Sequence, residues 1–113
     1  MTAQQAKLTE PLVDELLPKF FKALSDPTRI KIVQLLDKKE RNVTELIANL
    51  GISQSGVSNH LACLKWCGFV TSRKEGKSIY YRVTDDRIIN ILQFATQMIS
   101  DNAENIYACT RIQ

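Results

Sequence analysis

Three cysteines have the most distinctive chemistry in this chain, and two of them are four positions apart. Cys63 and Cys67 fall within one stretch of helical periodicity, and Cys109 lies near the C-terminus. Side chains at positions i and i+4 of a helix have Cβ atoms about 5–6 Å apart, whereas a disulfide needs about 3.5–4.5 Å. Two such thiolates suit a single metal ion, and three sulfurs without a spare imidazole favour a soft, large one. The alternative is that Cys63 and Cys67 are small buried hydrophobic residues, as free cysteines often are.

The helix that carries this cysteine pair begins with a different kind of side chain. Val57, Leu61 and Leu64 have the i, i+4, i+7 spacing of a buried helical stripe. Ser53 is a suitable N-cap, and Gly68 sits where the helix should end. A helix that is buried along one stripe and polar at its N-terminal end suits the major groove of DNA. Short polar groups face away from the stripe in its first turns: Gln54, Ser55, Ser58 and Asn59.

The sequence around this helix predicts a winged helix-turn-helix. Asn42 and Glu45 have capping-box spacing, and Gly51 provides a tight turn, so the helix-turn-helix should span residues 43–67. After the second helix the periodicity becomes alternating, and two β-rich runs flank a Lys-Glu-Gly-Lys segment. This pattern predicts a hairpin wing over residues 69–83. Basic side chains near its tip can follow the phosphates beside the groove: Arg73, Lys74 and Lys77.

Two apolar helices should flank this unit. Thr9-Glu10-Pro11 predicts the start of a first helix, over about residues 10–25, which Pro18 should kink or split. The last helix, over about residues 85–106, has more aliphatic residues than one small core needs. Both helices are therefore expected to form a homodimer interface, with residues 107–113 as a weakly ordered tail. The fold class is mainly α with a β-hairpin wing (α+β), in a single domain over residues 1–113.

The charge of the chain is unevenly distributed. Residues 19–82 carry 12 basic and 5 acidic side chains, whereas residues 1–18 and 83–113 each have a net charge of −2. A basic middle between acidic ends is typical of a nucleic-acid surface on a chain whose termini have another task. Residues 1–7 lack a signal-peptide core and no apolar run could span a bilayer, so a cytoplasmic protein is expected. One histidine and the lack of a glycine-rich phosphate loop argue against an enzyme.

Three motifs connect these features to a known family. They are Leu24–Ile32, Ser55–Leu61 and Glu75–Tyr81, and they occur in the family's order. Over roughly residues 15–100 the sequence closely resembles the ArsR/SmtB family of metal-responsive winged-helix repressors. The resemblance implies a cytoplasmic homodimer that binds a twofold operator DNA and is released when an inducer binds.

Members of this family carry sensor sites in several places. One cysteine pattern would fall on residues 42–44 and one histidine pattern on Arg87, so both of these sites are absent. Residues 61–68 are similar instead to a cadmium- and lead-sensing mycobacterial branch, in which two recognition-helix cysteines and one C-terminal cysteine form a three-sulfur site. The resemblance implies cadmium or lead as inducer, with zinc or arsenite as alternatives, and these metal ligands: Cys63, Cys67 and Cys109.

Five other residues in and around the helix-turn-helix have less specific expected roles. His60 is expected to contact phosphate or backbone rather than metal, because the resemblance places a histidine here in relatives with different sensor sites. Trp66 and Phe69 are expected to pack in the core. Arg29 and Lys31 are interpreted as ordinary solvated charges.

Two further functions stay open on the same scaffold. The three thiols could sense arsenite or oxidation instead of cadmium or lead. A winged helix could also bind protein without DNA, although the polar face of residues 54–59 and the basic wing argue against that.

Overall fold

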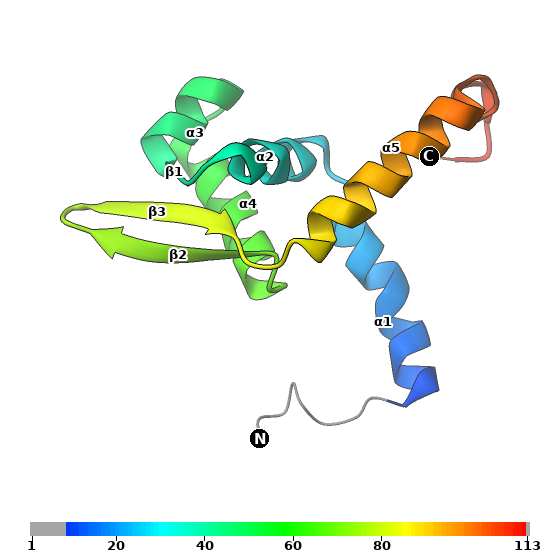
Figure 1. The fold of residues 1–113 in the computed structure, drawn as a ribbon, viewed down its shortest axis with the longest axis horizontal. Helices are drawn as coiled ribbons and strands as arrows, with labels where there is room; N and C mark the ends of the chain where they lie inside the picture. Colours follow the sequence, from blue (N-terminus) through cyan, green and yellow to red (C-terminus); the bar gives the residue numbers. More distant parts are fainter. Residues whose placement is uncertain (1–8, 113) are drawn as a thin grey trace.

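Figure 1 shows the computed structural model of the chain, which describes residues 9–112; the polar segment 1–7, Leu8 and Gln113 lie outside the described residues. α2, α3, α4 and the sheet form one body, from which α1 and α5 project in different directions (Figure 1). None of the described helices combines the length and the apolarity that a bilayer span requires. The elements in chain order are α1 (Glu10–Ala23), α2 (Pro27–Lys38), β1 (Arg41–Asn42), α3 (Val43–Leu50), α4 (Gln54–Trp66), β2 (Val70–Glu75), β3 (Ser78–Val83) and α5 (Arg87–Ala108).

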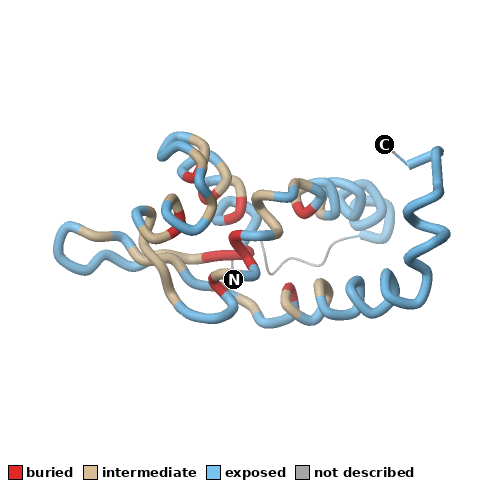
Figure 2. The backbone as a smooth tube through the Cα atoms, turned by 90° about the horizontal axis from the view of Figure 1, so that it is seen from above, coloured by how far each residue is buried: buried red, intermediate tan, exposed pale blue. Residues whose placement is uncertain are grey.

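The core lies where α2, α3 and α4 meet. Ile32 of α2, Leu46 of α3 and Leu64 of α4 are all 0% exposed. Burial of each such aliphatic side chain contributes about 1.5–3 kcal/mol to folding. Figure 2 shows that the buried positions concentrate in this body, whereas α1 and α5 are exposed along most of their length.

A tight turn sets the angle between α3 and α4. The amide of Glu45 donates to Asn42 Oδ1 at 2.8 Å and the amide of Asn42 donates to Glu45 Oε1 at 3.0 Å, which forms the expected capping box. Gly51 follows with a φ of 68°, in the left-handed region that favours glycine. Ser53 then caps α4 by accepting the amide of Gly56 at 3.1 Å. These local interactions direct the second helix of the helix-turn-helix across the body.

The wing is the hairpin of β2 and β3. The two strands pair in antiparallel register from Val70 and Val83 out to a two-residue turn at Gly76 and Lys77. Gly76 has a φ of 60° and Lys77 a negative φ, as in a type II′ hairpin turn. β1 pairs with the other edge of β3, so the strand order is β1-β3-β2. The winged helix-turn-helix that the sequence predicts is confirmed.

Both flanking helices differ from the sequence-based expectation. Pro18 does not split the first helix, since α1 is continuous from Glu10 to Ala23. Pro18 removes one amide donor, but this part of α1 is exposed, so water can bond the carbonyl left without a partner. α5 continues to Ala108, so the tail expected over residues 107–113 begins two residues later. Asn102 interrupts α5 with φ −127° and ψ 20°, which sets its last turns apart from the rest.

Candidate nucleic-acid interface and thiol pair

The N-terminal half of α4 presents the polar side chains that the sequence singles out. Gln54, Ser55, Ser58 and Asn59 are all exposed, whereas Val57 between them is fully buried. Ser55 Oγ lies 3.2 Å from the Oγ of the capping Ser53. The side chains of Ser58 and Asn59 are exposed, so their donors and acceptors are accessible to a ligand. This end of α4 is therefore a row of available hydrogen-bonding groups on a helix that the core holds in place.

His60 is placed differently from the polar residues before it. Its side chain is 24% exposed, and its Nε2 lies 4.0 Å from Asp26 Oδ1. Its Nδ1 lies 3.3 Å from Arg29 Nη1. Asp26 caps α2 by accepting the amides of Thr28 and Arg29 at 2.8 and 3.0 Å, and the Arg29 amide is the main reason that the pKa of Asp26 is lowered. In the absence of DNA, His60 therefore connects α4 to the start of α2.

Arg29 is an internal hydrogen-bond donor rather than a solvated charge, which corrects the sequence-based interpretation. Its Nε donates to the Ala23 carbonyl at 2.6 Å and its Nη2 to the Lys22 carbonyl at 3.5 Å. The last carbonyls of a helix lack partners within the helix, and a guanidinium there also complements the negative end of the helix dipole. Through these bonds and the His60 contact, Arg29 connects α1, α2 and α4.

Replacement of Arg29 by Ala is therefore expected to lower the free energy of unfolding by about 1–3 kcal/mol, because it leaves the end of α1 and His60 without their donor. Lys31→Ala, at an exposed position of the same helix, should change stability much less. Urea unfolding followed by circular dichroism measures both. Equal stability of the Arg29→Ala and Lys31→Ala proteins would contradict the role given to Arg29.

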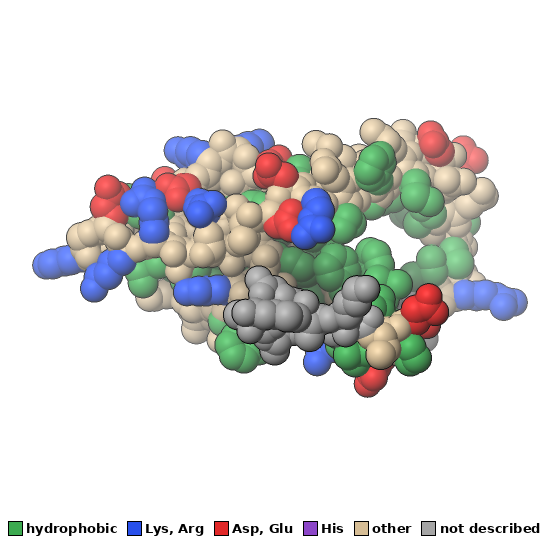
Figure 3. Space-filling view, turned by 60° about the horizontal axis from the view of Figure 1, so that its bottom comes forward, with side chains coloured by type: hydrophobic (Ala, Val, Ile, Leu, Met, Phe, Trp, Pro, Cys, Tyr) green, Lys and Arg blue, Asp and Glu red, His purple; other side chains and the backbone are tan. Residues whose placement is uncertain are grey.

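The wing carries cations of two kinds. Lys74 and Lys77 are exposed at the tip, and Figure 3 shows basic side chains gathered at this end of the molecule. Arg73 is instead paired with Glu40, at 2.9 Å, and its guanidinium lowers the pKa of that carboxyl. Lys65 of α4 donates to a β2 hydroxyl at 2.8 Å. The tip lysines are therefore the outward cations of the wing.

Cys63 and Cys67 lie side by side at the C-terminal end of α4. Cys63 is half-buried and Cys67 is exposed. Burial raises the pKa of the Cys67 thiol, as do the charge and hydrogen bonding of Cys63, while Arg29 and Lys19 act in the opposite direction. Cys67 lines a cavity of about 290 Å³ between α1, the end of α4 and the start of α5, whose wall also includes Phe20, Asp85 and Ile88.

Cys109 does not join this pair within one chain. It follows the last turn of α5 and is exposed. Figure 1 shows this end of α5 far from α4. Among residues 9–112, no three His, Cys, Asp or Glu side chains are grouped so that they could hold a metal ion. The structure thus brings together two of the three ligands that the sequence suggests.

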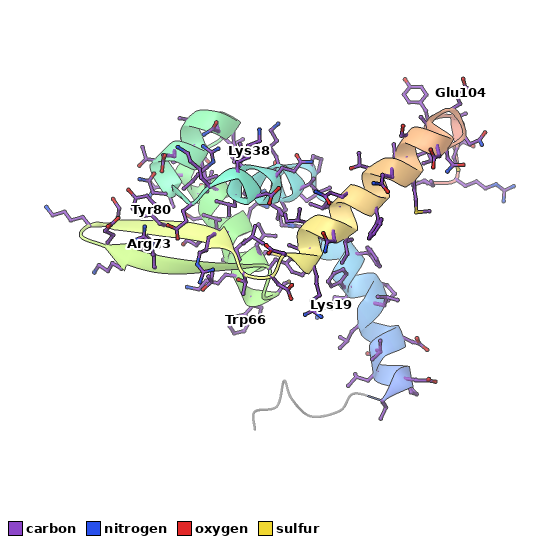
Figure 4. The ribbon with its side chains drawn as sticks, viewed as in Figure 1. Lys19, Lys38, Trp66, Arg73, Tyr80 and Glu104 are labelled. Atoms are coloured by element: carbon purple, nitrogen blue, oxygen red, sulfur yellow. The ribbon has the colours of Figure 1, made fainter. Side chains whose placement is uncertain are left out.

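The two aromatic residues on either side of Cys67 differ in burial. Phe69 is 7% exposed and belongs to the core, as expected. Trp66 is 94% exposed and points outward from the end of α4, which corrects the expectation that it packs inside (Figure 4). Two residues correspond to about 200° around a helix, so Trp66 lies opposite the buried Leu64. Trp66 is the single tryptophan of the chain and therefore an optical probe beside Cys67.

Comparison with known sequences adds family information to this geometry. The profile of the family "Bacterial regulatory protein, arsR family" matches residues 26–72. The chain is 44% identical over 94 residues to the "Probable mercury resistance operon repressor" of Streptomyces lividans. The matched region covers 83% of this chain and 75% of that protein. It is 35% identical over 92 residues to the regulator CmtR of Mycobacterium tuberculosis H37Rv, covering 81% and 78%.

Solved structures resemble the fold over most of its length. The crystal structure of M. tuberculosis Rv0081 matches with a TM-score of 0.79 and 32% identity, covering 88% of this chain and 100% of that one. The solution structure of the homodimeric winged helix-turn-helix domain Mb0332 from M. bovis matches with a TM-score of 0.71 and 26% identity, covering 87% and 92%. The winged helix-turn-helix of this chain agrees with the fold of these relatives. The chain therefore belongs to the arsR family of bacterial regulatory proteins and is a winged helix-turn-helix transcriptional regulator, not an enzyme.

Proposed function

We propose that this protein is a dimeric, metal-responsive repressor that binds operator DNA and is released when a soft metal ion binds its cysteine thiolates. The observation that carries the proposal is the composition of α4. One helix has a row of available polar groups at its start and a pair of adjacent thiols at its end. An ion held by the thiols can therefore change the orientation of the polar groups that face DNA.

The DNA contacts divide into two groups. Gln54, Ser55, Ser58 and Asn59 are proposed to meet base edges and nearby phosphates in the major groove, as the start of a recognition helix does. The tip lysines of the wing are proposed to contact phosphates, which contribute affinity without sequence information. His60 and Arg73 contact other residues of the same chain, and they are proposed to hold α4 and the wing in position.

The two groups give different expected results. A Ser58→Ala, Asn59→Ala double variant should weaken specific operator binding, by about 1–3 kcal/mol for each base-edge hydrogen bond that the variant can no longer form. Lys74→Ala should instead lower affinity for all DNA sequences and reduce the slope of its salt dependence by about one. Fluorescence anisotropy with operator and random duplexes over a range of salt separates the two. A double variant that bound its operator as tightly as the parent would refute the placement of α4 in the major groove.

The dimer is proposed to form through α1 and α5. The two helices enclose a nearly all-apolar groove of about 330 Å³, lined by Val13, Leu16, Leu17, Phe20, Phe21 and Ile91. Further out on α5, Phe94, Met98 and Ile99 are 64%, 65% and 51% exposed. A second copy of the chain would cover this surface, and the homodimeric state of the similar Mb0332 domain supports it. Two α4 helices related by a twofold axis suit an operator with two half-sites.

The metal site is proposed to be completed across the dimer. Cys63 and Cys67 fit a soft ion, because two sulfur donors already lie together and no histidine is grouped with them in the described residues. Cys109 of the partner subunit is proposed as the third ligand, since Cys109 lies far from α4 of its own chain. The ion would supply bonds to sulfur that tie the end of one α5 to the α4 of the other subunit. That link would fix the separation of the two α4 helices. An operator with a fixed half-site spacing tolerates little change in this separation.

Cadmium or lead is the inducer proposed on the resemblance to CmtR. Mercury is a second candidate, because the relative named a mercury resistance operon repressor is more identical to this chain, at 44% against 35%. All three ions prefer thiolate ligands. Release of labelled operator from the reduced protein by each ion, with zinc and arsenite for comparison, ranks them. If no thiophilic ion releases the operator in the presence of reductant, the proposed sensing function fails.

A further inference from the structure

Arg73 and Glu40 form the most extensive ion pair of the wing. Arg73 Nε lies 3.1 and 3.2 Å from the two carboxylate oxygens of Glu40, and its Nη2 lies 2.9 Å from Glu40 Oε1. Two parallel N–H···O contacts of this kind fix the direction of both side chains as well as their distance. Arg73 belongs to β2, whereas Glu40 stands just before β1, at the other edge of the sheet.

Tyr80 of the middle strand lies between these two ends. Arg73 and Tyr80 are cross-strand partners, and the guanidinium carbon lies 5.0 Å from the centre of the Tyr80 ring. This distance is within the range of a cation–π contact. The side chain of Arg73 thus crosses one face of β3 to reach Glu40, and the three strands are joined on that face by one residue. Figure 4 shows Arg73 and Tyr80 together on the hairpin.

The opposite face of β2 is fastened one residue earlier. Ser72 accepts a hydrogen bond from Lys65 Nζ of α4 at 2.8 Å. Successive side chains of a strand point to opposite faces, so Ser72 and Arg73 hold the same place in β2 from two sides. Beyond them, residues 74–77 are all exposed. The lysine-bearing tip therefore extends from a point that is tied both to α4 and to the end of α2.

We propose that the Glu40–Arg73 pair is a brace that sets the direction of the wing relative to α4, so that both residues are positioning residues for DNA binding. This proposal rests on the proposed function. Without this pair, the hairpin would be held by the short β1–β3 pairing and by the bond to Ser72, so its outer part could bend. Its tip lysines would then miss the phosphates that α4 brings into reach. Glu40 supports DNA binding in this account although it is an acid beside a basic wing.

The competing interpretation predicts the opposite sign. If Arg73 bound a phosphate directly, Glu40 would compete for it, and loss of the Glu40 charge would tighten DNA binding. It would also steepen the salt dependence by about one phosphate contact. Removal of an acid near DNA favours binding on simple electrostatic grounds as well. Weaker binding after removal of Glu40 is therefore specific to the brace.

The first comparison uses two isosteric changes beside the same guanidinium. Glu40→Gln keeps the shape but offers one acceptor in place of the paired carboxylate oxygens. Glu75→Gln removes the same charge from a carboxylate that makes a single, longer contact with Arg73, at 3.4 Å. We expect Glu40→Gln to weaken operator binding about threefold or more, within the range of coupled residues, and Glu75→Gln not to weaken it. Glu40→Gln binding as tight as the parent's, or tighter, overturns the proposal.

The second comparison restores the pair with reversed charges. Glu40→Arg combined with Arg73→Glu places opposite charges at the same two positions, and it should bind operator about threefold or more tighter than Arg73→Glu alone. Asp37→Arg combined with Arg73→Glu adds the same charge on α2 without restoring the pair, and it should recover less. Equal recovery by the two double variants overturns the brace.

A measurement without DNA separates this proposal from the function on which it rests. Amide hydrogen exchange at residues 70–83 should be faster in Glu40→Gln than in the parent and in Glu75→Gln, because the outer hairpin is less firmly held. A parent protein with no salt-dependent operator binding would refute the proposed function, and the exchange data would still decide the brace. Unchanged exchange in Glu40→Gln, like unchanged affinity, overturns it.

Discussion

Leu17→Glu should convert the protein into a monomer that has lost operator binding by about 100-fold or more. Leu17 is 49% exposed in the single chain and lines the apolar groove between α1 and α5, so the charge does not enter the core. In the proposed dimer the same carboxylate would be buried without a partner, which strongly disfavours association. A monomer reaches one half-site only, and loss of bivalent binding typically costs about 10²–10⁴ in affinity. Sedimentation and operator anisotropy measure the two effects.

The matched control is Lys22→Gln, which makes the same change of net charge at an exposed position of α1. It should leave the protein dimeric and operator binding within a small factor of the parent's. Circular dichroism should show that Leu17→Glu keeps its helices, since the buried core does not include Leu17. A parent that sediments as a monomer at micromolar concentration, or a Leu17→Glu protein that remains dimeric, would refute the proposed interface.

The second large effect concerns release rather than binding. Cys63→Ser combined with Cys67→Ser should abolish release of the operator by cadmium, lead or mercury while the metal-free protein still binds DNA as tightly as the parent. Serine is close in size to cysteine but replaces a thiolate with a poor ligand for soft ions. Neither cysteine lies among the exposed polar residues at the start of α4, so the DNA-reading surface is unchanged. Titration of the operator complex with each ion, in reductant, gives the result directly.

Cys109→Ser is the comparison that tests completion of the site across the dimer. It should keep metal binding through the pair on α4, with weaker affinity, and lose most of the release. Mixing Cys109→Ser chains with Cys63→Ser, Cys67→Ser chains should give heterodimers with one complete site if the third ligand comes from the other subunit. Full release of operator from the double serine variant at the parent's cadmium concentration would place the sensor elsewhere.

The sequence predicts the elements with local signals. Asn42 with Glu45, Gly51 and Ser53 have short-range roles that follow from residue type and spacing, and the structure contains each of them. The alternation after Gly68 predicts the wing for the same reason. Pro18 misleads because its penalty depends on exposure: in α1 the freed carbonyl can reach water, so the helix continues.

The roles of individual charges require the three-dimensional structure. Arg29 and Glu40 look like ordinary surface residues in the sequence, but each has partners 6 to 33 positions away. The one available signal for Arg29 is its place just after the end of α1, where helix carbonyls need donors. No sequence pattern pairs Glu40 with Arg73, because the pairing depends on β1 joining the sheet next to β3. The position of Cys109 likewise follows from how far α5 extends.

DNA and metal are proposed to act on the same helix of one dimer, and metal is proposed to weaken operator binding. Because such coupling is reciprocal, the operator must weaken metal binding by the same factor. The direct test measures metal affinity twice, for the free protein and for the operator complex, with Trp66 fluorescence reporting on Cys67 beside it. We expect the operator to weaken metal binding by the factor by which metal weakens operator binding, about 5–150-fold for a typical coupling. Equal metal affinity in the free and the operator-bound protein would contradict the account.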